Sequence, residues 1–314
     1  MSLAFVFPGQ GSQAVGMGKA LAEAFPAARE VFSEVDDALN QHLSRLMFEG
    51  PLDELTLTEN AQPALMAASL AVMRVITREV RFDVAAKVRF VAGHSLGEYS
   101  ALAAVGAFTL ADAARLLKLR GKAMQAAVPV GVGAMAALLG VDLAAARAIA
   151  SDAAQGEVCD IANDNGAGQV VVSGHKAAVE RAIEIAKERG VKRAMALPVS
   201  APFHSALMAP AAQVMAGALK TAIIHTPAVP VVANVTAAPV NGPDDIRARL
   251  VEQVTATVRW SDSVTFMAGT GGVTRFAELG AGKVLTGLAK RLAPDAEAMA
   301  LGLPADIETF MKTV

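Results

Sequence analysis

The chain alternates short apolar runs with longer segments of helical periodicity. Residues 3–7 are a continuous apolar run that ends in the turn Pro-Gly-Gln-Gly. Residues 88–92, predicted as a second buried strand, are apolar except for Arg89 and end in the turn Gly-His-Ser-Leu-Gly. Uninterrupted apolar runs of this length, bounded by turn residues, are typical of buried parallel strands. Helical patterns cover residues 17–49 and 60–79, and an Ala-rich helix is predicted after the second turn. Strands that alternate with helices predict an α/β fold.

Residues 130–199 have a rhythm of their own. Strands are predicted at 135–139, 158–162, 169–173 and 193–199, and helices at 143–154 and 177–189. The resulting order, βαββαβ, is that of a ferredoxin-like unit. We therefore expect a larger core, made of residues 1–129 and 200–314, that is interrupted by a small subdomain at 130–199. Further core strands are predicted near 229–233 and 274–278.

The hydrophobic content is high, yet we expect no membrane span. Of the 314 residues 54% are hydrophobic, and the mean hydropathy is +0.41. The uncharged stretches at 123–141, 194–219 and 221–243 are rich in alanine or interrupted by proline, whereas a spanning helix needs about 20 strongly apolar residues. The first seven residues carry no basic residue, unlike a secretory signal. We therefore expect a soluble, cytoplasmic protein.

The charge and the cysteine content exclude several classes of function. A formal net charge of −2 gives no electrostatic reason to expect nucleic-acid binding. The single cysteine, Cys159, excludes a disulfide framework and any multi-cysteine zinc or iron–sulfur site.

The turn at residues 93–97 matches the G-x-S-x-G pattern of a nucleophile elbow. It lies where that motif requires, after an apolar strand and before a helix. The glycines permit a tight turn that holds the serine oxygen at a helix N-terminus, where backbone N–H groups stabilise negative charge. The motif therefore predicts that Ser95 is a nucleophile and that the N–H of Leu96 is an oxyanion donor. The alternative is a chance match in a chain rich in alanine and glycine.

A serine nucleophile needs a general base, and His204 is the best placed of the five histidines. It lies in a loop after the predicted subdomain and follows the serine in chain order, as in α/β-hydrolase-like sites. His94 should leave its turn on the side away from Ser95. The other histidines fit solvated positions or a strand end: His42, His175 and His225. Sequence position alone leaves a structural role for His204 open.

Arg120 is a charged residue on the apolar face of a predicted helix. That helix begins at Thr109, where Asp112 suggests a capping box, and its positions 113, 116, 117 and 124 form an apolar stripe. Arg120 falls within the stripe, whereas the basic residues at 115, 118 and 122 share the opposite face and should be solvated. A buried guanidinium either pairs with a carboxylate or awaits an anionic ligand, and both remain open. Beside a serine nucleophile, the guanidinium would bind an acyl group that carries a free carboxylate.

Three further motifs match binding patterns only in part. Residues 9–14 fit the loose dinucleotide-binding form after a strand, but no acidic residue ends a second strand about 20 positions later. That loop can instead present Gln10 to the site. Residues 280–283 fail the phosphate-loop pattern. The glycosylation sequon at 234–236 has no meaning without an export signal.

Several long motifs, in order along essentially the whole chain, resemble those of the malonyl-CoA:acyl carrier protein transacylase family. They are FVFPGQGSQ at 5–13, AGHSLGEYSAL at 92–102, LRGKAMQ at 119–125, GQVVVSG at 168–174, SAPFHSALM at 200–208 and ELGAGKVLTGLAKR at 278–291. The resemblance implies an α/β-hydrolase-like core with a ferredoxin-like insert, which agrees with the order of elements given above.

The resemblance also implies roles for individual residues. Ser95 would be acylated, His204 would be its base, and Arg120 would bind the malonyl carboxylate. Gln10, together with the N–H of Leu96, would form the oxyanion hole. A carbonyl of Gln253 would orient the histidine in place of the usual carboxylate. The bulk of Phe203 matches the malonyl-specific pattern, which leaves little room for an α-methyl branch. Asp164 stands where an amide is common in the family, a departure expected to affect only the rim of the site.

The implied activity is transfer of the malonyl group from malonyl-CoA to the phosphopantetheine thiol of acyl carrier protein. The transfer would pass through a malonyl-serine intermediate, in a ping-pong mechanism that supplies fatty-acid synthesis. We expect a monomer that needs no metal or redox cofactor. Exposed basic residues are candidates for contacting the acidic carrier protein: Lys192, Arg193, Lys283, Lys290 and Arg291.

Three alternatives stay open at this point. A serine hydrolase or thioesterase could use the same elbow, and would release the acyl group to water. A malonyltransferase could serve polyketide synthesis or malonate decarboxylase, differing only in the acceptor carrier protein. A non-enzymatic acyl-binding module would need no nucleophile.

Overall fold

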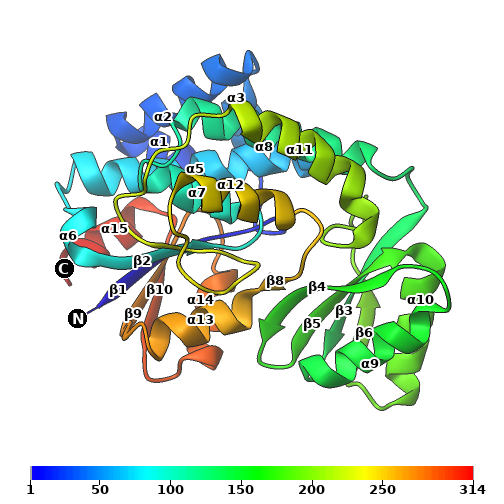
Figure 1. The fold of residues 1–314 in the computed structure, drawn as a ribbon. Helices are drawn as coiled ribbons and strands as arrows, with labels where there is room; N and C mark the ends of the chain where they lie inside the picture. The colour runs from blue at the N-terminus through cyan, green and yellow to red at the C-terminus, as the bar shows by residue number, and fades with distance from the viewer. Residues whose placement is uncertain (1, 314) are drawn as a thin grey trace.

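Two five-stranded sheets organise residues 2–313, the part of the chain that the computed structural model describes (Figure 1). In the larger sheet all neighbouring strands are parallel. Its strands, in spatial order, are β10 (Glu297–Leu301), β9 (Arg275–Leu279), β1 (Leu3–Phe7), β2 (Val88–Gly93) and β7 (Val231–Val232). The α/β fold that the sequence predicts is confirmed.

The larger sheet is buried on both faces, which explains the uninterrupted apolar run of β1. Along β1, Leu3, Phe5 and Phe7 enter one core cluster, and Ala4 and Val6 enter another. Successive side chains of a strand point to opposite faces, so a strand that is covered on both sides shows no polar alternation.

Most helices belong to the first of these clusters. Those that contribute buried residues to it are α1 (Lys19–Ala24), α2 (Pro26–Leu39), α3 (Leu43–Glu49), α4 (Leu52–Thr56), α5 (Thr58–Arg78), α7 (Gly97–Ala104), α8 (Leu110–Ala126), α11 (Ala209–Thr221), α12 (Pro243–Glu252) and α15 (Pro304–Met311). The second cluster receives α13 (Trp260–Ala268) and α14 (Val284–Leu292). Two short helices, α6 (Val84–Lys87) and the 3-10 turn η1 (Ala206–Met208), complete this part of the chain.

The smaller sheet has its own apolar cluster, shared with two helices. In spatial order its strands are β6 (Arg193–Ala196), β3 (Gly133–Leu139), β5 (Gln169–His175), β4 (Cys159–Gly166) and β8 (Val258–Arg259). The helices are α9 (Leu143–Ala154) and α10 (Lys176–Glu188). Neighbouring strands are antiparallel except β4 and β8, which are parallel. Because β8 comes from far along the chain, it ties the later core segment to this sheet; Figure 1 shows the two sheets on either side of it.

The sequence predicted the first two core strands and the elements within 130–199 to within a few residues, but it missed most of the elements after residue 200. It did not predict β8, β10 or helices α11 to α15. β10 lies at the edge of its sheet and is only partly buried, and its apolar run is only four residues long, at 298–301. In α11, Pro210 suggests a break in the chain, although proline is favourable in the first turn of a helix, where its missing N–H has no partner to lose. Between residues 2 and 313 no helix is long and apolar enough to cross a bilayer.

Candidate active site

The carboxyl ends of β1 and β2 bring two glycine-containing loops together. The strands are parallel neighbours, and Phe7 pairs with Gly93, so the loop that holds Gln10 begins beside the turn that holds Ser95. Ser95 has φ +54°, in the left-handed region, where a residue other than glycine is strained. Such strain persists only where the surroundings enforce it, and it is common at functional sites.

The glycines on either side of Ser95 are required by close backbone contacts. A Cβ at Gly93 would lie 1.8 Å from the carbonyl oxygen of Gly97, and a Cβ at Gly97 would lie 2.3 Å from the carbonyl oxygen of Phe7. Neither position can therefore hold a larger residue without movement of the main chain. These two contacts explain the spacing G-x-S-x-G. With glycine at both positions, α7 can begin two residues after the serine.

Asn234 holds the elbow from the neighbouring loop. Its Oδ1 accepts a hydrogen bond from the backbone N–H of Ser95 at 2.8 Å, and its Nδ2 donates to the carbonyl of Gly93 at 2.7 Å. The side chain is fully buried. In the sequence this residue stands out only as part of a meaningless glycosylation sequon, because its partners lie about 140 residues away. Sequence reasoning therefore missed it.

Ser95 and His204 form a hydrogen-bonded pair. The Oγ of Ser95 lies 2.7 Å from Nε2 of His204, and Nδ1 of the same ring lies 2.9 Å from the backbone carbonyl oxygen of Gln253. Because a carbonyl only accepts, Nδ1 must carry the hydrogen, which leaves Nε2 free to accept the serine proton. Burial, reinforced by the positive charge of Arg120, lowers the pKa of His204 to about 3. The ring is therefore neutral and able to act as a base near pH 7.

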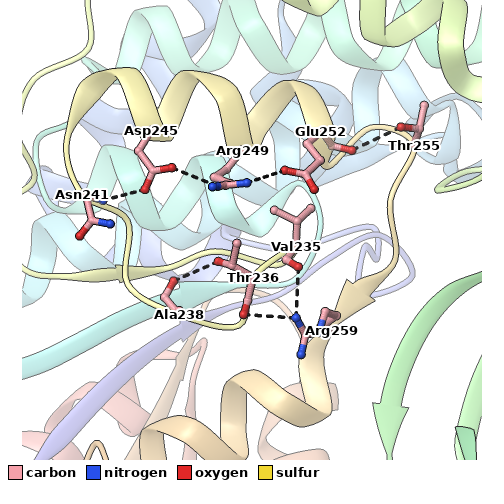
Figure 2. A network of polar contacts seen from close by, with 9 residues as sticks. All are labelled: Val235, Thr236, Ala238, Asn241, Asp245, Arg249, Glu252, Thr255 and Arg259. Atoms are coloured by element: carbon pink, nitrogen blue, oxygen red, sulfur yellow. Dashed lines mark hydrogen bonds and ion pairs between the residues drawn. The ribbon is translucent and has the colours of Figure 1, made fainter.

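The end of α12 supplies the carbonyl that orients His204. Gln253 is the first residue after the helix, and the last carbonyls of a helix have no partner within it. The partial negative charge at a helix C-terminus also favours the positive charge that the ring gains as a base. Figure 2 shows Arg249 between Asp245 and Glu252 along this helix, and Thr255 on the carbonyl of Glu252 in the turn beyond it.

A second contact in Figure 2 steadies the loop that carries Asn234. The Nη1 of Arg259 donates to the carbonyls of Val235 and Thr236, at 3.5 and 3.4 Å. These two residues directly follow Asn234, and Arg259 itself lies in β8. The strand that joins the smaller sheet therefore also supports the loop behind the elbow.

Arg120 is buried beside the serine, with no counter-ion in the described part of the chain. Its Nη1 donates to Oε1 of Gln62 at 2.8 Å, and its Nη2 donates to Oε1 of Gln253 at 2.9 Å and to Oγ of Ser95 at 3.2 Å. The side chain is 1% exposed, and its Nε–H has no hydrogen-bond partner among residues 2–313. Within the same residues it takes part in no ion pair. Of the two interpretations of a charge on the apolar stripe, this geometry favours the one with a waiting anion site.

One cavity of about 400 Å³ gathers most of the candidate site residues. Its lining includes Gln10, Ser95, Leu96, Arg120, Phe203 and His204. Gln253 does not line the cavity and reaches it through its contacts with Arg120 and His204. The six residues come from loops and helices that the sequence separates by up to about 190 positions, so only the fold brings them together.

The remaining histidines do not contact Ser95. His94 also lines the cavity, but its Nε2 lies 2.9 Å from Oδ1 of Asn165 and its ring packs against Trp260. His175 accepts a backbone hydrogen bond from residue 158 through Nδ1. His42 is exposed, as the sequence predicts, whereas the prediction that His225 ends a strand is wrong, because it lies exposed in a loop. His204 is thus the histidine that the fold brings to the serine.

The structure also bears on three other features noted in the sequence: Lys118, the loop at 280–283 and Asp164. The prediction that Lys118 is solvated is wrong: it is half-buried, and its ammonium donates to Gln41 and Asn60. The loop at 280–283 precedes α14, whose first N–H groups are already bonded to the buried carboxylate of Glu278, so a phosphate would find that helix end occupied. Asp164 is largely buried and accepts from the N–H of Gly166.

The described residues include no group suited to hold a metal ion and one buried cysteine. From residue 2 to residue 313 no three histidine, cysteine, aspartate or glutamate side chains are grouped so that they could hold a metal ion. The thiol of Cys159 is buried, and burial raises its pKa to about 11, so it stays protonated near pH 7.

Sequence reasoning missed two residues besides Asn234 that contact the site. Gln62 and Glu98 are both almost fully buried, and Glu98 accepts a hydrogen bond from the side chain of Gln253. A usable signal existed for Glu98, since it is the one charged residue of α7.

Comparison with known proteins agrees with this geometry. The acyl transferase domain family matches residues 4–290. The malonyl CoA-acyl carrier protein transacylase of Bacillus subtilis is 45% identical, over 99% of this chain and 97% of the relative. The acyl-carrier-protein-S-malonyltransferase of Bartonella henselae has a similar structure, with a TM-score of 0.97, 55% identity and coverage of 100% and 99% of the two chains. A type II polyketide-synthase malonyl-transacylase, solved in complex with its acyl carrier protein, gives a TM-score of 0.96 at 42% identity, with both chains fully covered. A serine elbow, a neutral histidine and an unpaired arginine thus lie in a chain that belongs to the malonyl CoA-acyl carrier protein transacylase family of acyl transferases.

Proposed function

We propose that the chain transfers a malonyl group from malonyl-CoA to the phosphopantetheine thiol of an acyl carrier protein. The observation that carries this proposal is the unpaired, buried guanidinium of Arg120, 3.2 Å from the hydroxyl of Ser95. A neutral acyl group would leave that charge without a partner, whereas the free carboxylate of a malonyl group satisfies it. The family membership supports the same substrate.

In the first half of the reaction, Ser95 attacks the thioester carbonyl while His204 accepts the hydroxyl proton. The negative oxygen of the tetrahedral intermediate accepts hydrogen bonds from Gln10 and from the N–H of Leu96. The carbon–sulfur bond then breaks, His204 returns the proton to the departing sulfur, and coenzyme A leaves as a thiol. The product is a malonyl ester of Ser95.

In the second half, the thiol of the carrier protein attacks this ester. His204 takes the thiol proton and gives it back to the serine oxygen as the carbon–oxygen bond breaks. Thioester and serine ester are both activated acyl groups, so the cycle needs no metal or redox cofactor. Exposed basic side chains are proposed to contact the acidic carrier: Lys192, Arg193, Lys283, Lys290 and Arg291. The neighbour solved with its acyl carrier protein supports an acceptor of this class.

Phe203 is proposed to restrict the acyl group. It is buried, lines the cavity and directly precedes the base. A branch on the α-carbon of the acyl group would have to share this space, so the unbranched malonyl group fits better.

We further propose an α/β-hydrolase-like core, formed by residues 1–129 and 200–314, with a ferredoxin-like subdomain at 130–199. The spatial order β6-β3-β5-β4 with antiparallel neighbours supports the subdomain, and the parallel order β10-β9-β1-β2-β7 supports the core. The elbow between β2 and α7 is where such a core places its nucleophile.

Intact-mass measurement after addition of malonyl-CoA tests the proposed function. A malonyl adduct should form on the unmodified chain and be absent from Ser95→Ala, and it should be discharged by a phosphopantetheinylated carrier protein. Rapid release of malonate to water, without transfer to any carrier, would instead indicate a hydrolase. A panel of carrier proteins from fatty-acid, polyketide and malonate decarboxylase systems would identify the acceptor.

A further inference from the structure

A buried carboxylate lies behind the site and takes no part in the proposed mechanism. Glu98, three residues after Ser95 and in the first turn of α7, is 2% exposed. Its Oε2 accepts two hydrogen bonds, from the backbone N–H of Asn234 at 3.0 Å and from Nε2 of Gln253 at 2.8 Å. Burial raises its pKa to about 7, against the opposing effect of these two donors and of Arg120. A buried carboxylate in a helix turn next to a nucleophile calls for a specific role.

The contacts of Gln253 show what Glu98 controls. Its Nε2 faces Glu98 and also donates to the carbonyl of Ser95 at 3.0 Å, while its Oε1 faces Nη2 of Arg120. If the amide turned over, its NH2 group would meet the N–H groups of the guanidinium, and its oxygen would meet the carboxylate. Two attractive contacts would become repulsive ones. The acceptor atom of Glu98 makes the shortest of the three contacts to Nε2, ahead of the carbonyl of Ser95 at 3.0 Å and Oδ1 of Asn234 at 3.4 Å, so it contributes most to which end of the amide faces Arg120.

We propose that Glu98 is a positioning residue for carboxylate-bearing acyl groups, which it favours by fixing the Gln253 amide that holds Arg120. This inference rests on the proposed function and extends it to a specific determinant of acyl selection. The guanidinium is held between two neutral carbonyl oxygens, those of Gln62 and Gln253. Neutral acceptors fix the guanidinium without cancelling its charge, so a substrate carboxylate can still bind it strongly.

The arrangement also explains why the carboxylate of Glu98 is linked to Arg120 through the side chain of Gln253 and not by a direct contact. A glutamate in direct contact would form a buried ion pair and compete with the malonyl carboxylate for the same N–H groups. With the Gln253 amide between them, Glu98 orders the arginine and leaves its unpartnered Nε–H available.

Two substitutions of Glu98 separate its hydrogen-bonding role from its bulk. In Glu98→Gln, the side-chain oxygen can occupy the position of Oε2, because both donors converge on that one atom. In Glu98→Met, a side chain of similar length has no acceptor there. The measured quantity is the ratio of the acylation rate constants for malonyl-CoA and acetyl-CoA, each from single-turnover formation of the acyl-enzyme by intact mass.

Glu98→Met is expected to lower the malonyl-to-acetyl ratio by about tenfold or more, while Glu98→Gln keeps it within about threefold of the unmodified chain. A general loss of structure would lower both rates alike and leave the ratio unchanged, so an unchanged ratio in Glu98→Met overturns the proposal. An equal fall of the ratio in both variants also overturns it, because the charge and not the acceptor atom would then be responsible.

A variant of Gln253 keeps the test decisive if Glu98→Met does not fold. Gln253→Met removes the amide but retains the backbone carbonyl that binds His204. It should lower the malonyl-to-acetyl ratio as Glu98→Met does, and an unchanged ratio would refute the inference. If the unmodified chain forms no malonyl adduct at all, the proposed function fails and this inference fails with it. If the adduct forms and only the ratios do not respond, the failure is confined to Glu98.

Discussion

Arg120→Ala provides the sharpest test of the proposed anion site. In the free protein, the buried guanidinium donates only to neutral groups and retains a free Nε–H. A malonyl carboxylate would accept about two hydrogen bonds from it, and a hydrogen bond to a charged group contributes about 1.5–3 kcal/mol. Their loss therefore amounts to about 3–6 kcal/mol, or about 150- to 25,000-fold in kcat/KM for malonyl-CoA. Acetyl-CoA has no carboxylate to lose and should fall by about tenfold or less, through the long contact with Ser95.

The assay compares acylation by malonyl-CoA and by acetyl-CoA in the same variant. Arg115→Ala is a matched control, because it removes an arginine from the same helix whose side chain is exposed and does not line the cavity. It should leave both rates unchanged. Arg120→Ala should still fold, since the guanidinium has no carboxylate partner that its removal would leave buried and unpaired. Equal losses for the two acyl groups would show that Arg120 acts on the fold or on Ser95, and not on the substrate carboxylate.

Three further predictions concern the elbow, the base and an unrelated helix. Asn234→Ala leaves the N–H of Ser95 and the carbonyl of Gly93 without their partner, so the free energy of unfolding in urea should fall by about 2–4 kcal/mol. The control Asn241→Ala, at an exposed side chain, should change it by less than about 0.5 kcal/mol. Because burial lowers the pKa of His204 from 6.5 to about 3, acylation rates should show no loss of the base near pH 6.5. Between pH 6.5 and 3 the unfolded chain binds a proton on this ring that the folded chain does not, so His204 should also reduce the free energy of unfolding as the pH falls through that range. An inflection near 6.5 in the rate profile that is traced to this ring by its NMR titration would contradict the burial argument. Gly217→Ala should raise the free energy of unfolding by about 0.5–1 kcal/mol, because Gly217 lies within α11 with open space around its Cβ position, and no gain would show that this helix frays in solution.

The positions of the central elements follow from local patterns. A strand buried on both faces is apolar along its length, so β1, and β2 apart from the exposed Arg89, are recognisable without any knowledge of their neighbours. The elbow is equally local, since the turn, the two glycines and the following helix lie within a few residues of Ser95. A single arginine on an apolar helix face is visible in the same way, because burial of a charge is costly wherever it occurs.

Elements whose stability depends on distant partners were missed. β8 has two residues, and it is a strand only because β4 lies beside it. Asn234 looks like any asparagine in a loop until the elbow is placed against it. The position of Gln253 came from a family resemblance, and nothing in the pattern around it shows that the end of α12 would face His204.

The amino-acid sequence by itself determined the α/β class, the G-x-S-x-G turn at Ser95 and the presence of a buried charge at Arg120. Each of these depends on interactions within one strand, turn or helix. The tertiary structure alone decided that this charge has no counter-ion among residues 2–313, that His204 reaches the serine, and that Glu98 contacts the Gln253 amide that holds Arg120. Those properties are relations between side chains far apart in the chain, and a hydrogen bond exists only where the fold brings both partners within about 3 Å.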